Sequence, residues 1–359
     1  MADRPPLRIL QVGSALHDWS GIERYLVYLT GGLAARGHSV VATCPPGSAL
    51  SQRLGVPTEP VGLKNRANLL AIIATARILR RHNIQILHAH YSPDFVMAGL
   101  AAKLARTPVT LLTRHVATHW SRTKIRRLLG LYQHIIPVSE ATKASLEADG
   151  VPGNRMTVAY GGVAPLQANL GHDQARAKLG LEPERFWVGF VGRLVPEKGV
   201  NVLIDAFALL PPMYGLAIFG DGSEMAALRS RIDRGNLGDR VRLFGYVTDV
   251  ADAMTAVDAL ALPSVWAEAF PFAVLEAMSV GTPVVASAVG GLGEQIRDGE
   301  NGLLVPPNDP AALAVALRRC HEEPAAAARW GSNGQAGQLR DFTVERFVER
   351  VERVYLKLL

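Results

Sequence analysis

Residues 192–199, with the sequence GRLVPEKG, combine the residue types that bind a phosphate group. They follow an apolar run at 186–191 that is typical of a buried strand. Gly192 lets the backbone approach a ligand, and a helix that begins near Gly199 would direct its positive end to the same place. Arg193 adds a bidentate donor and Lys198 a point charge, and both suit a diphosphate. The alternative is a solvated basic loop.

Two carboxylates stand at the ends of residues 268–276, which read EAFPFAVLE. Pro271 suits the first turn of a helix, so Glu268 would precede that helix and Glu276 would lie inside it. A carboxylate in a largely apolar helix is costly without a partner, and sugar hydroxyls are good partners. At a rise of ~1.5 Å per residue the two lie up to about 12 Å apart, so one could meet a transferred sugar and the other a ribose. The alternative is a surface glutamate and a capping glutamate.

Two further segments follow predicted strands. Residues 13–24, GSALHDWSGIER, stand where a phosphate loop belongs, but neither the G-x-G-x-x-G fingerprint nor a P-loop motif is present. Thr113, Arg114 and His115 stand at the carboxyl end of another strand. A lone histidine is most often structural, but ligands of doubly wound sheets bind at strand ends.

Strands and helices must position these segments. Both halves of the chain alternate short β-branched runs with amphipathic helical patterns. That alternation is typical of parallel sheets covered by helices. A helix over 22–36 would end at Gly37, as helices commonly do. The predicted strands are 7–12, 39–43, 84–88, 109–113 and 135–138 in the first half, and 186–191, 215–219, 241–244, 259–262, 283–286 and 302–305 in the second.

The sequence YGGVAP at 160–165 breaks the periodicity and predicts a domain boundary. A chain of 359 residues is also long enough for two cores. We therefore expect an α/β protein with two Rossmann-like, doubly wound parallel-sheet domains, 1–164 and 165–342, that face a central cleft. An amphipathic helix over 343–359 is expected to pack back on the first domain.

The composition, with 48% apolar and 19% charged residues, excludes an intrinsically disordered chain. The N-terminus lacks the pattern of a signal peptide, and no apolar stretch approaches the length of a membrane span. Cys44 and Cys320 match no metal-ligand spacing, which favours buried thiols in a reducing compartment. The expected location is cytoplasmic, or peripheral on the inner face of the cytoplasmic membrane.

The net charge of +6 is divided unevenly along the chain. Residues 1–165 hold 19 Lys and Arg against 8 Asp and Glu, whereas residues 166–359 hold 19 against 24. The basic half predicts an anionic partner there, unless the charge serves solubility alone. Residues 122–133 mix basic and apolar side chains, as a helix at an anionic membrane surface would. The alternative is that their apolar side chains pack into the domain.

Taken together, the motifs resemble those of the retaining glycosyltransferases of family four, which adopt the GT-B fold. Residues 192–199 and the Glu268-x7-Glu276 pair, followed by AMSVGTPVVA at 277–286, carry most of the resemblance. Weaker matches extend it over nearly the whole chain: SGIER at 20–24, HAH at 88–90, TRH at 113–115, VSE at 138–140, GDG at 220–222, FGYV at 244–247, and GG at 290–291 with NGLLVP at 301–306.

The resemblance implies roles for the donor side of the site. Arg193 and Lys198 would neutralise the donor diphosphate, and Glu276 would hydrogen-bond the donor ribose. Glu268 would contact the transferred sugar near the reaction centre. The donor itself would be a nucleotide-diphosphate sugar.

The same resemblance implies that backbone amides around Phe272 and Ala273 cap the phosphates. Gly21 would let the N-terminal domain close over them, and the segment 245–247, with Val247, would line the base pocket. His115 would sit beside the donor sugar from the acceptor side.

Three positions depart from the family pattern. Ser20-Gly21 replaces a Gly-Gly pair, with little expected effect because the helix start is preserved. Residues 161–164 read GGVA in place of an Asn-Gly-Val-Asp junction, so the junction is expected to flex differently or to contact ligand less. Pro271 stands where many members have glycine, which removes one backbone donor to phosphate.

No Asp-x-Asp pair follows a predicted strand, so we expect no metal and no cofactor beyond the donor. Charge stabilisation would rest on Arg193, Lys198 and helix N-termini. The resemblance implies front-side attack without an enzyme nucleophile, in which the leaving diphosphate accepts the acceptor's proton. The expected acceptor is a glycan, lipid-linked or phosphorylated, in the synthesis of lipopolysaccharide or another cell-surface glycan; no nucleic-acid partner is expected.

Three other functions stay open. The chain lacks the G-x-G-x-x-G fingerprint of a dinucleotide-dependent oxidoreductase, and that function would leave Glu268 and Glu276 unexplained. A nucleotide-sugar epimerase or a glycosyl phosphorylase on the same fold would use water or phosphate as acceptor. A non-catalytic binder would hold the donor without turning it over.

Overall fold

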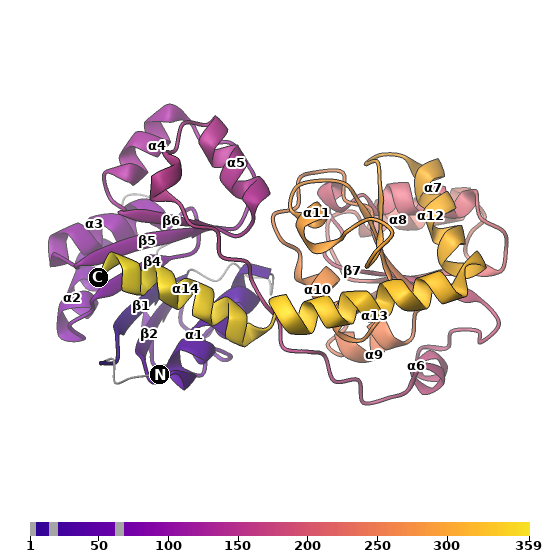
Figure 1. Cartoon of the computed structure of the whole chain (residues 1–359), viewed down its shortest axis with the longest axis horizontal. Coiled ribbons are helices and arrows are strands. Elements are labelled where there is room, and N and C mark those ends of the chain that lie inside the picture. Colours follow the sequence, from indigo (N-terminus) through magenta and orange to yellow (C-terminus); the bar gives the residue numbers. More distant parts are fainter. Residues whose placement is uncertain (1–4, 14–20, 62–67) are drawn as a thin grey trace. The chain divides into compact units, whose positions relative to one another are not determined.

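The computed structural model describes residues 5–13, 21–61 and 68–359. The chain forms two compact units, one of residues 1–162 with 344–359 and the other of residues 163–343. The division falls after Gly162, two residues before the boundary that the sequence predicts after residue 164. We call the first the N-terminal unit and the second the C-terminal unit, and describe each by itself (Figure 1).

The N-terminal unit is built on a six-stranded sheet in the order β3-β2-β1-β4-β5-β6, in which all pairs are parallel. Its strands are β1 Arg8–Val12, β2 Ser39–Cys44, β3 Thr58–Pro60, β4 Ile86–Ala89, β5 Val109–Arg114 and β6 His134–Pro137. Five of them lie where the sequence predicts strands. The short edge strand β3 was not predicted, since three residues ending in proline carry no strand pattern.

The described part of this unit contains the α-helices α1 Gly21–Ala35, α2 Leu69–Arg81, α3 Phe95–Ala105, α4 Arg122–Leu129, α5 Glu140–Ala148 and the C-terminal α14 Val344–Leu358. Helix α14 packs against α1, far from it in sequence (Figure 1). Gly32 allows this close crossing, because a Cβ there would lie 2.3 Å from Val348 Cγ2. Glu352 adds bonds to Arg36 (2.9 Å) and His38 (2.8 Å).

The C-terminal unit repeats the architecture with a sheet in the order β12-β11-β10-β7-β8-β9, again parallel throughout. Its strands are β7 Phe186–Val191, β8 Tyr214–Phe219, β9 Val241–Gly245, β10 Ala259–Leu262, β11 Val284–Ser287 and β12 Leu303–Val305. Each lies within one residue of its predicted bounds. The predicted α/β fold class, with two doubly wound parallel sheets, is confirmed.

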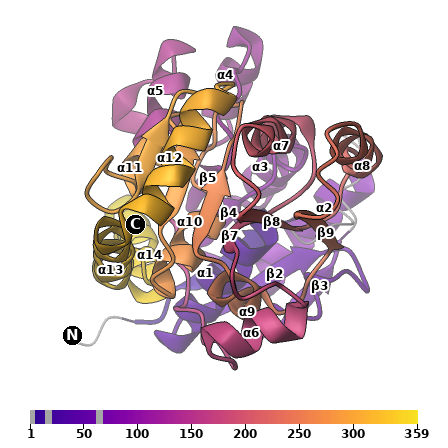
Figure 2. The same cartoon turned by 90° about the vertical axis from the view of Figure 1, so that its right-hand side faces the viewer.

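Helices cover both faces of this second sheet. Figure 2 shows α7, α8 and α12 on one face and α6 and α9 on the other. The helices are α6 His172–Leu179, α7 Val200–Ala208, α8 Met225–Arg234, α9 Val250–Thr255, α10 Phe272–Ser279, α11 Leu292–Gln295, α12 Pro310–Glu322 and α13 Pro324–Asp341. Because both faces are covered, strands β7, β8, β10 and β11 are buried along most of their length, whereas the edge strand β9 is mostly half-buried.

Helix α4 corrects one expectation about the basic surface. Its apolar Ile125 and Leu128 are buried in the core of the N-terminal unit, while Arg122, Arg126 and Arg127 are exposed. The apolar side chains therefore pack inward and leave no apolar face for insertion into lipid. Within the described ranges, no helix is both long enough and apolar enough to cross a membrane.

Candidate active site

The two predicted donor-site segments meet at one edge of the C-terminal unit. Strands β7 and β10 are neighbours and parallel, so the loops that follow them leave the sheet side by side. The amide of Val265 donates to the carbonyl of Glu197 (3.0 Å) and joins the two loops. Gly199 has φ +63°, and a Cβ there would lie 2.1 Å from the carbonyl oxygen of Pro263. Only glycine fits this crossing, so the sequence signal at Gly199 reflects packing as well as helix initiation.

Lys198 and Glu268 form an ion pair between these loops. Lys198 Nζ lies 2.5 Å from Glu268 Oε1, and the Ser264 hydroxyl donates to the same oxygen (2.6 Å). The side chains of Lys198 and Glu268 are 22% and 15% exposed, so both can reach a ligand. From the sequence, Lys198 is expected to contact a diphosphate and Glu268 a transferred sugar. The structure brings them together.

The backbone of Glu268 is fixed by the loop that follows β11. The amide of Gly291 donates to the carbonyl of Glu268 (2.7 Å). Gly290, at φ +55°, has no room for a side chain, because a Cβ would lie 2.0 Å from that carbonyl oxygen. The Glu268 carboxylate therefore projects from a backbone that is fixed by the loop after β11.

Arg193 stands two residues after the end of β7, and its side chain is exposed. The neighbouring backbone is anchored: Leu194 donates its amide to Asp221 (2.8 Å), and its carbonyl accepts from the amide of Glu224 (2.9 Å). Arg193 thus combines a fixed main chain with a guanidinium that faces solvent, an arrangement suited to an anionic ligand.

Helix α10 begins at this same edge. Its N-cap is Pro271, which supplies no side-chain cap, and the amides of Phe272 and Ala273 stand in the first turn. Gln295 holds the cap residue by donating to its carbonyl (3.2 Å). Glu276 lies one turn further on and is only 1% exposed. A helix start next to Lys198 and Glu268 can bind a phosphate through backbone amides and the helix dipole.

Val247 lies beyond β9, at the carboxyl end of the sheet's edge strand. It is half-buried and packs against the cluster that contains Trp187 and Phe219. Phe244 stacks on Phe219, with ring centroids 4.8 Å apart. Glu268, Lys198 and Val247 therefore follow β10, β7 and β9 at one edge of one sheet.

In the N-terminal unit, His115 stands beside a buried network of polar side chains. Gln11 Nε2 donates to Tyr355 Oη (3.0 Å), which lies 2.6 Å from His88 Nδ1. His88 Nε2 lies 2.6 Å from the Thr113 hydroxyl, and His90 Nε2 lies 2.6 Å from Gln11 Oε1. All five network residues are at most 1% exposed. The C-terminal helix thus contributes to the strand ends of this unit through Tyr355.

Burial keeps these histidines neutral. It lowers the pKa of His88 and of His90 well below the usual range. Burial, with the nearby charge of Arg114, lowers the pKa of His115 to about 3. His115 packs edge-on against Tyr25, with centroids 4.5 Å apart, and its buried Nε2 has no hydrogen-bond partner among the described residues. At neutral pH His115 can exchange a hydrogen bond with a ligand but carries no charge.

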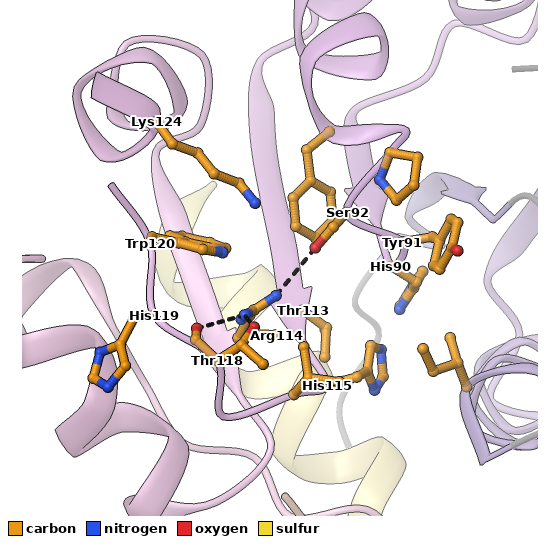
Figure 3. A pocket seen from close by; sticks show the side chains of 14 residues that line it. His90, Tyr91, Ser92, Thr113, Arg114, His115, Thr118, His119, Trp120 and Lys124 are labelled. Carbon is orange, nitrogen blue, oxygen red and sulfur yellow. Dashed lines mark hydrogen bonds between the residues drawn. The ribbon is translucent and has the colours of Figure 1, made fainter. Parts of the chain in front are cut away.

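His115 lines a pocket of about 290 Å³ in the N-terminal unit (Figure 3). Arg114, Trp120 and Lys124 line it too. In the sequence, Arg114 stands at a predicted strand end and Lys124 in the basic segment 122–133, but neither was expected to line a pocket, and Trp120 was not singled out. Gly21 is the exposed first residue of α1, whereas Ser20 lies outside the described residues. In the part of the chain that the structure describes, no group of three or more His, Cys, Asp or Glu side chains is placed to hold a metal ion.

Comparisons with known proteins identify the family. Residues 19–165 match the family described as Glycosyltransferase Family 4, and residues 172–337 match Glycosyl transferases group 1. Over 291 residues, 78% of each chain, the sequence is 30% identical to the lipopolysaccharide core biosynthesis mannosyltransferase LpsB of Rhizobium meliloti (strain 1021). The chain belongs to the group 1 glycosyltransferases. The resemblance of the sequence motifs to the family-four glycosyltransferases is confirmed.

Solved structures agree on the GT-B fold of this glycosyltransferase. HepE of Anabaena, in complex with UDP and glucose, is 25% identical with a TM-score of 0.87, over 98% of this chain and 100% of that one. The lipopolysaccharide outer core galactosyltransferase WaaB, in its apo form, has a TM-score of 0.77 at 18% identity, over 98% of this chain and 100% of that one. At 18% identity, the similarity to WaaB is evidence of the fold alone.

Proposed function

We propose that this glycosyltransferase is a retaining enzyme that transfers a sugar from a nucleotide-diphosphate sugar to a glycan acceptor. The observation that carries the proposal is the edge of the C-terminal sheet, where Arg193, Lys198, Glu268 and the start of α10 gather. The UDP and glucose bound to HepE support a nucleotide-sugar donor. The name of LpsB supports an acceptor in lipopolysaccharide or another cell-surface glycan.

In this proposal the site stabilises the charge that develops on the leaving diphosphate. Lys198 exchanges part of its contact with Glu268 for a phosphate oxygen, and Arg193 adds a bidentate contact. The amides of Phe272 and Ala273 contribute at the start of α10. These groups replace a divalent metal, and the diphosphate accepts the proton of the attacking acceptor hydroxyl.

The carboxylates hold the rest of the donor. Glu268, once relieved of Lys198, accepts hydrogen bonds from hydroxyls of the transferred sugar, and Glu276 accepts them from the ribose. Val247 provides an apolar contact for the base. His115, neutral at physiological pH, hydrogen-bonds a substrate hydroxyl without adding charge.

Contact with an anionic membrane stays a prediction that rests on electrostatics alone. The exposed Arg122, Arg126 and Arg127 of α4 supply attraction but no insertion. Such contact would bring the enzyme to a lipid-borne acceptor.

The test is a donor screen followed by product analysis. Nucleotide sugars that raise the thermal unfolding midpoint are incubated with glycan acceptors, and NMR reports the anomeric configuration of the product. We expect the donor's configuration to be kept and the rate to be unchanged by excess chelator. Inversion would overturn retention, and loss of activity restored by magnesium or manganese would overturn metal independence. Turnover to free sugar, to an epimer or to a sugar phosphate would favour the alternative activities.

A further inference from the structure

Arg114 places a buried positive charge in the wall of the N-terminal pocket. Its side chain is only 3% exposed and stands at the carboxyl end of β5. Its terminal nitrogens donate to the Ser92 hydroxyl (3.1 Å) and to the carbonyl (2.7 Å) and hydroxyl (2.5 Å) of Thr118. Its Nε has no hydrogen-bond partner in the part of the chain that the structure describes. All of these acceptors are neutral, so the guanidinium is held in place but not neutralised.

The described part of the pocket lining offers that charge no carboxylate. None of its described lining residues is an Asp or a Glu. Asp149 attracts Arg114, but its oxygens accept bonds from His119 Nδ1 (2.7 Å) and from the amide of Trp120 (2.6 Å). Burial lowers the pKa of Arg114 to about 10, so the side chain is still protonated near neutral pH. A buried cation without a carboxylate partner is costly, and a bound anion would remove that cost.

A second cation joins Arg114 at the same wall. Arg114 Cζ lies 4.8 Å from the ring centroid of Trp120, and Lys124 Nζ lies 5.0 Å from it. Figure 3 shows Arg114 and Lys124 directed toward the same space, with Trp120 beside them. Trp120 is itself 5% exposed and fixed through its amide by Asp149. Both cations therefore contact one aromatic ring in the pocket wall, and an anion bound beside that ring would interact with both of them.

We propose that this pocket is an anion subsite for the acceptor, in which Arg114 and Lys124 bind a phosphate or carboxylate group carried by the acceptor glycan. The proposal rests on the transferase function proposed above and narrows its acceptor to an anionic saccharide. The pocket, at about 290 Å³, is near the lower end of ligand sites and suits one charged sugar rather than a long chain. His115, on the same wall, would meet that sugar's hydroxyls.

The first test uses the unaltered protein and isothermal titration calorimetry. The probes are glucose 6-phosphate, glucuronate, inorganic phosphate and neutral methyl glucoside, at low and high salt. We expect at least one anionic sugar to bind about 10-fold or more tightly than methyl glucoside, because a charged hydrogen-bonded pair contributes at least that much. The phosphate and carboxylate probes distinguish the two sources of charge. Equal affinity for charged and neutral sugars would overturn the proposal.

The second test uses Arg114→Gln and Lys124→Gln, with Arg126→Gln as the matched control. Arg126 lies on α4 with Lys124 but is exposed and outside the pocket lining. We expect the first two variants to lose the preference for anionic sugars and the control to keep it. Retained preference in a natively folded Arg114→Gln would mean that Arg114 only anchors the loop through Thr118. Should that variant fail to fold, Lys124→Gln decides the same question, because Lys124 is more exposed and its loss removes one of the two proposed charges.

Nucleoside diphosphate binding, measured in every variant, separates this proposal from the transferase function. All three variants should bind it as the unaltered protein does, because its proposed site is in the C-terminal unit. An unaltered protein that binds anionic sugars but no nucleoside diphosphate would refute the donor assignment and leave the anion subsite standing. An unaltered protein that binds nucleoside diphosphate but shows no preference for anionic sugars would refute the anion subsite and leave the donor assignment standing.

Discussion

The two units share one architecture and build their candidate sites in opposite ways. In the C-terminal unit, the site residues come from short loops after neighbouring strands, and the charged groups Arg193, Lys198 and Glu268 reach solvent. In the N-terminal unit, the neutral histidines His88 and His90 lie in a buried polar network that includes Tyr355, from the helix at the far end of the chain. The exposed charges suit a phosphate that binds and leaves. The buried, hydrogen-bonded network instead holds the side chains of the pocket wall in fixed positions.

The two kinds of site are encoded differently in the sequence. A loop such as 192–199 carries its chemistry in consecutive residues, so a motif is enough to find it. The network around His115 depends on contacts such as His88 with Tyr355, which are 267 positions apart in sequence. The motifs at 88–90 and 113–115 mark His88, His90 and Thr113, but no motif shows their contacts with Gln11 and Tyr355.

The largest expected effect is on the exposed phosphate-binding charges. Arg193→Ala or Lys198→Ala should lower turnover by about 10²-fold or more, because the transition state loses a preorganised cation. The thermal unfolding midpoint should barely move for Arg193, which is exposed. Arg297→Ala, an exposed arginine in the same unit, serves as the control in a steady-state transfer assay. Near-normal rates in both test variants would refute the assignment.

The next effect separates the two glutamates. Glu276→Ala should weaken binding of both the donor and the free nucleoside diphosphate, because its proposed partner is the ribose. Glu268→Ala should spare the free nucleotide and impair turnover, because its proposed partner leaves with the sugar. Calorimetry with the nucleotide and kinetics with the donor measure the two effects. Equal losses of nucleotide affinity in both variants would contradict the division.

A smaller effect concerns the pH dependence of stability. The pKa of His115 falls from 6.5 to about 3 on folding, so the unfolded chain binds its proton first as the pH drops. His115 therefore contributes stability above its unfolded pKa of 6.5, and that contribution is lost progressively below it. His115→Gln should flatten the fall in unfolding free energy between about pH 7 and pH 5. An unchanged slope in His115→Gln would show that this histidine is not kept neutral by burial.

The smallest expected effect is on membrane contact. Each exposed arginine of α4 adds about 1 kcal/mol of attraction to an anionic surface at low salt. Replacing Arg122, Arg126 and Arg127 with glutamine should reduce sedimentation with anionic vesicles and leave transfer to a soluble acceptor unchanged. Neutral vesicles provide the control. Binding to anionic vesicles that survives both the substitutions and high salt would require a different surface.

Much of the fold and part of the site could be predicted from sequence. The periodicity placed eleven strands within two residues of their positions, because strands covered on both faces are continuous apolar runs. It missed β3, and it left the orientation of the 122–133 helix open until packing showed Ile125 and Leu128 inside the core. The motifs located Lys198 and Glu268 but not their ion pair, since the residues are 70 positions apart and local spacing says nothing about contacts across loops.

Hydrogen–deuterium exchange on the whole chain tests whether the C-terminal unit builds the donor site. The ligand is whichever of UDP, GDP or ADP raises the thermal unfolding midpoint. We expect protection of backbone amides in residues 192–199 and 268–276, with the first turn of α10 most affected, and no comparable change at 109–120. Protection confined to 88–91 and 109–120, with residues 192–199 and 268–276 exchanging as in the free protein, would contradict the account.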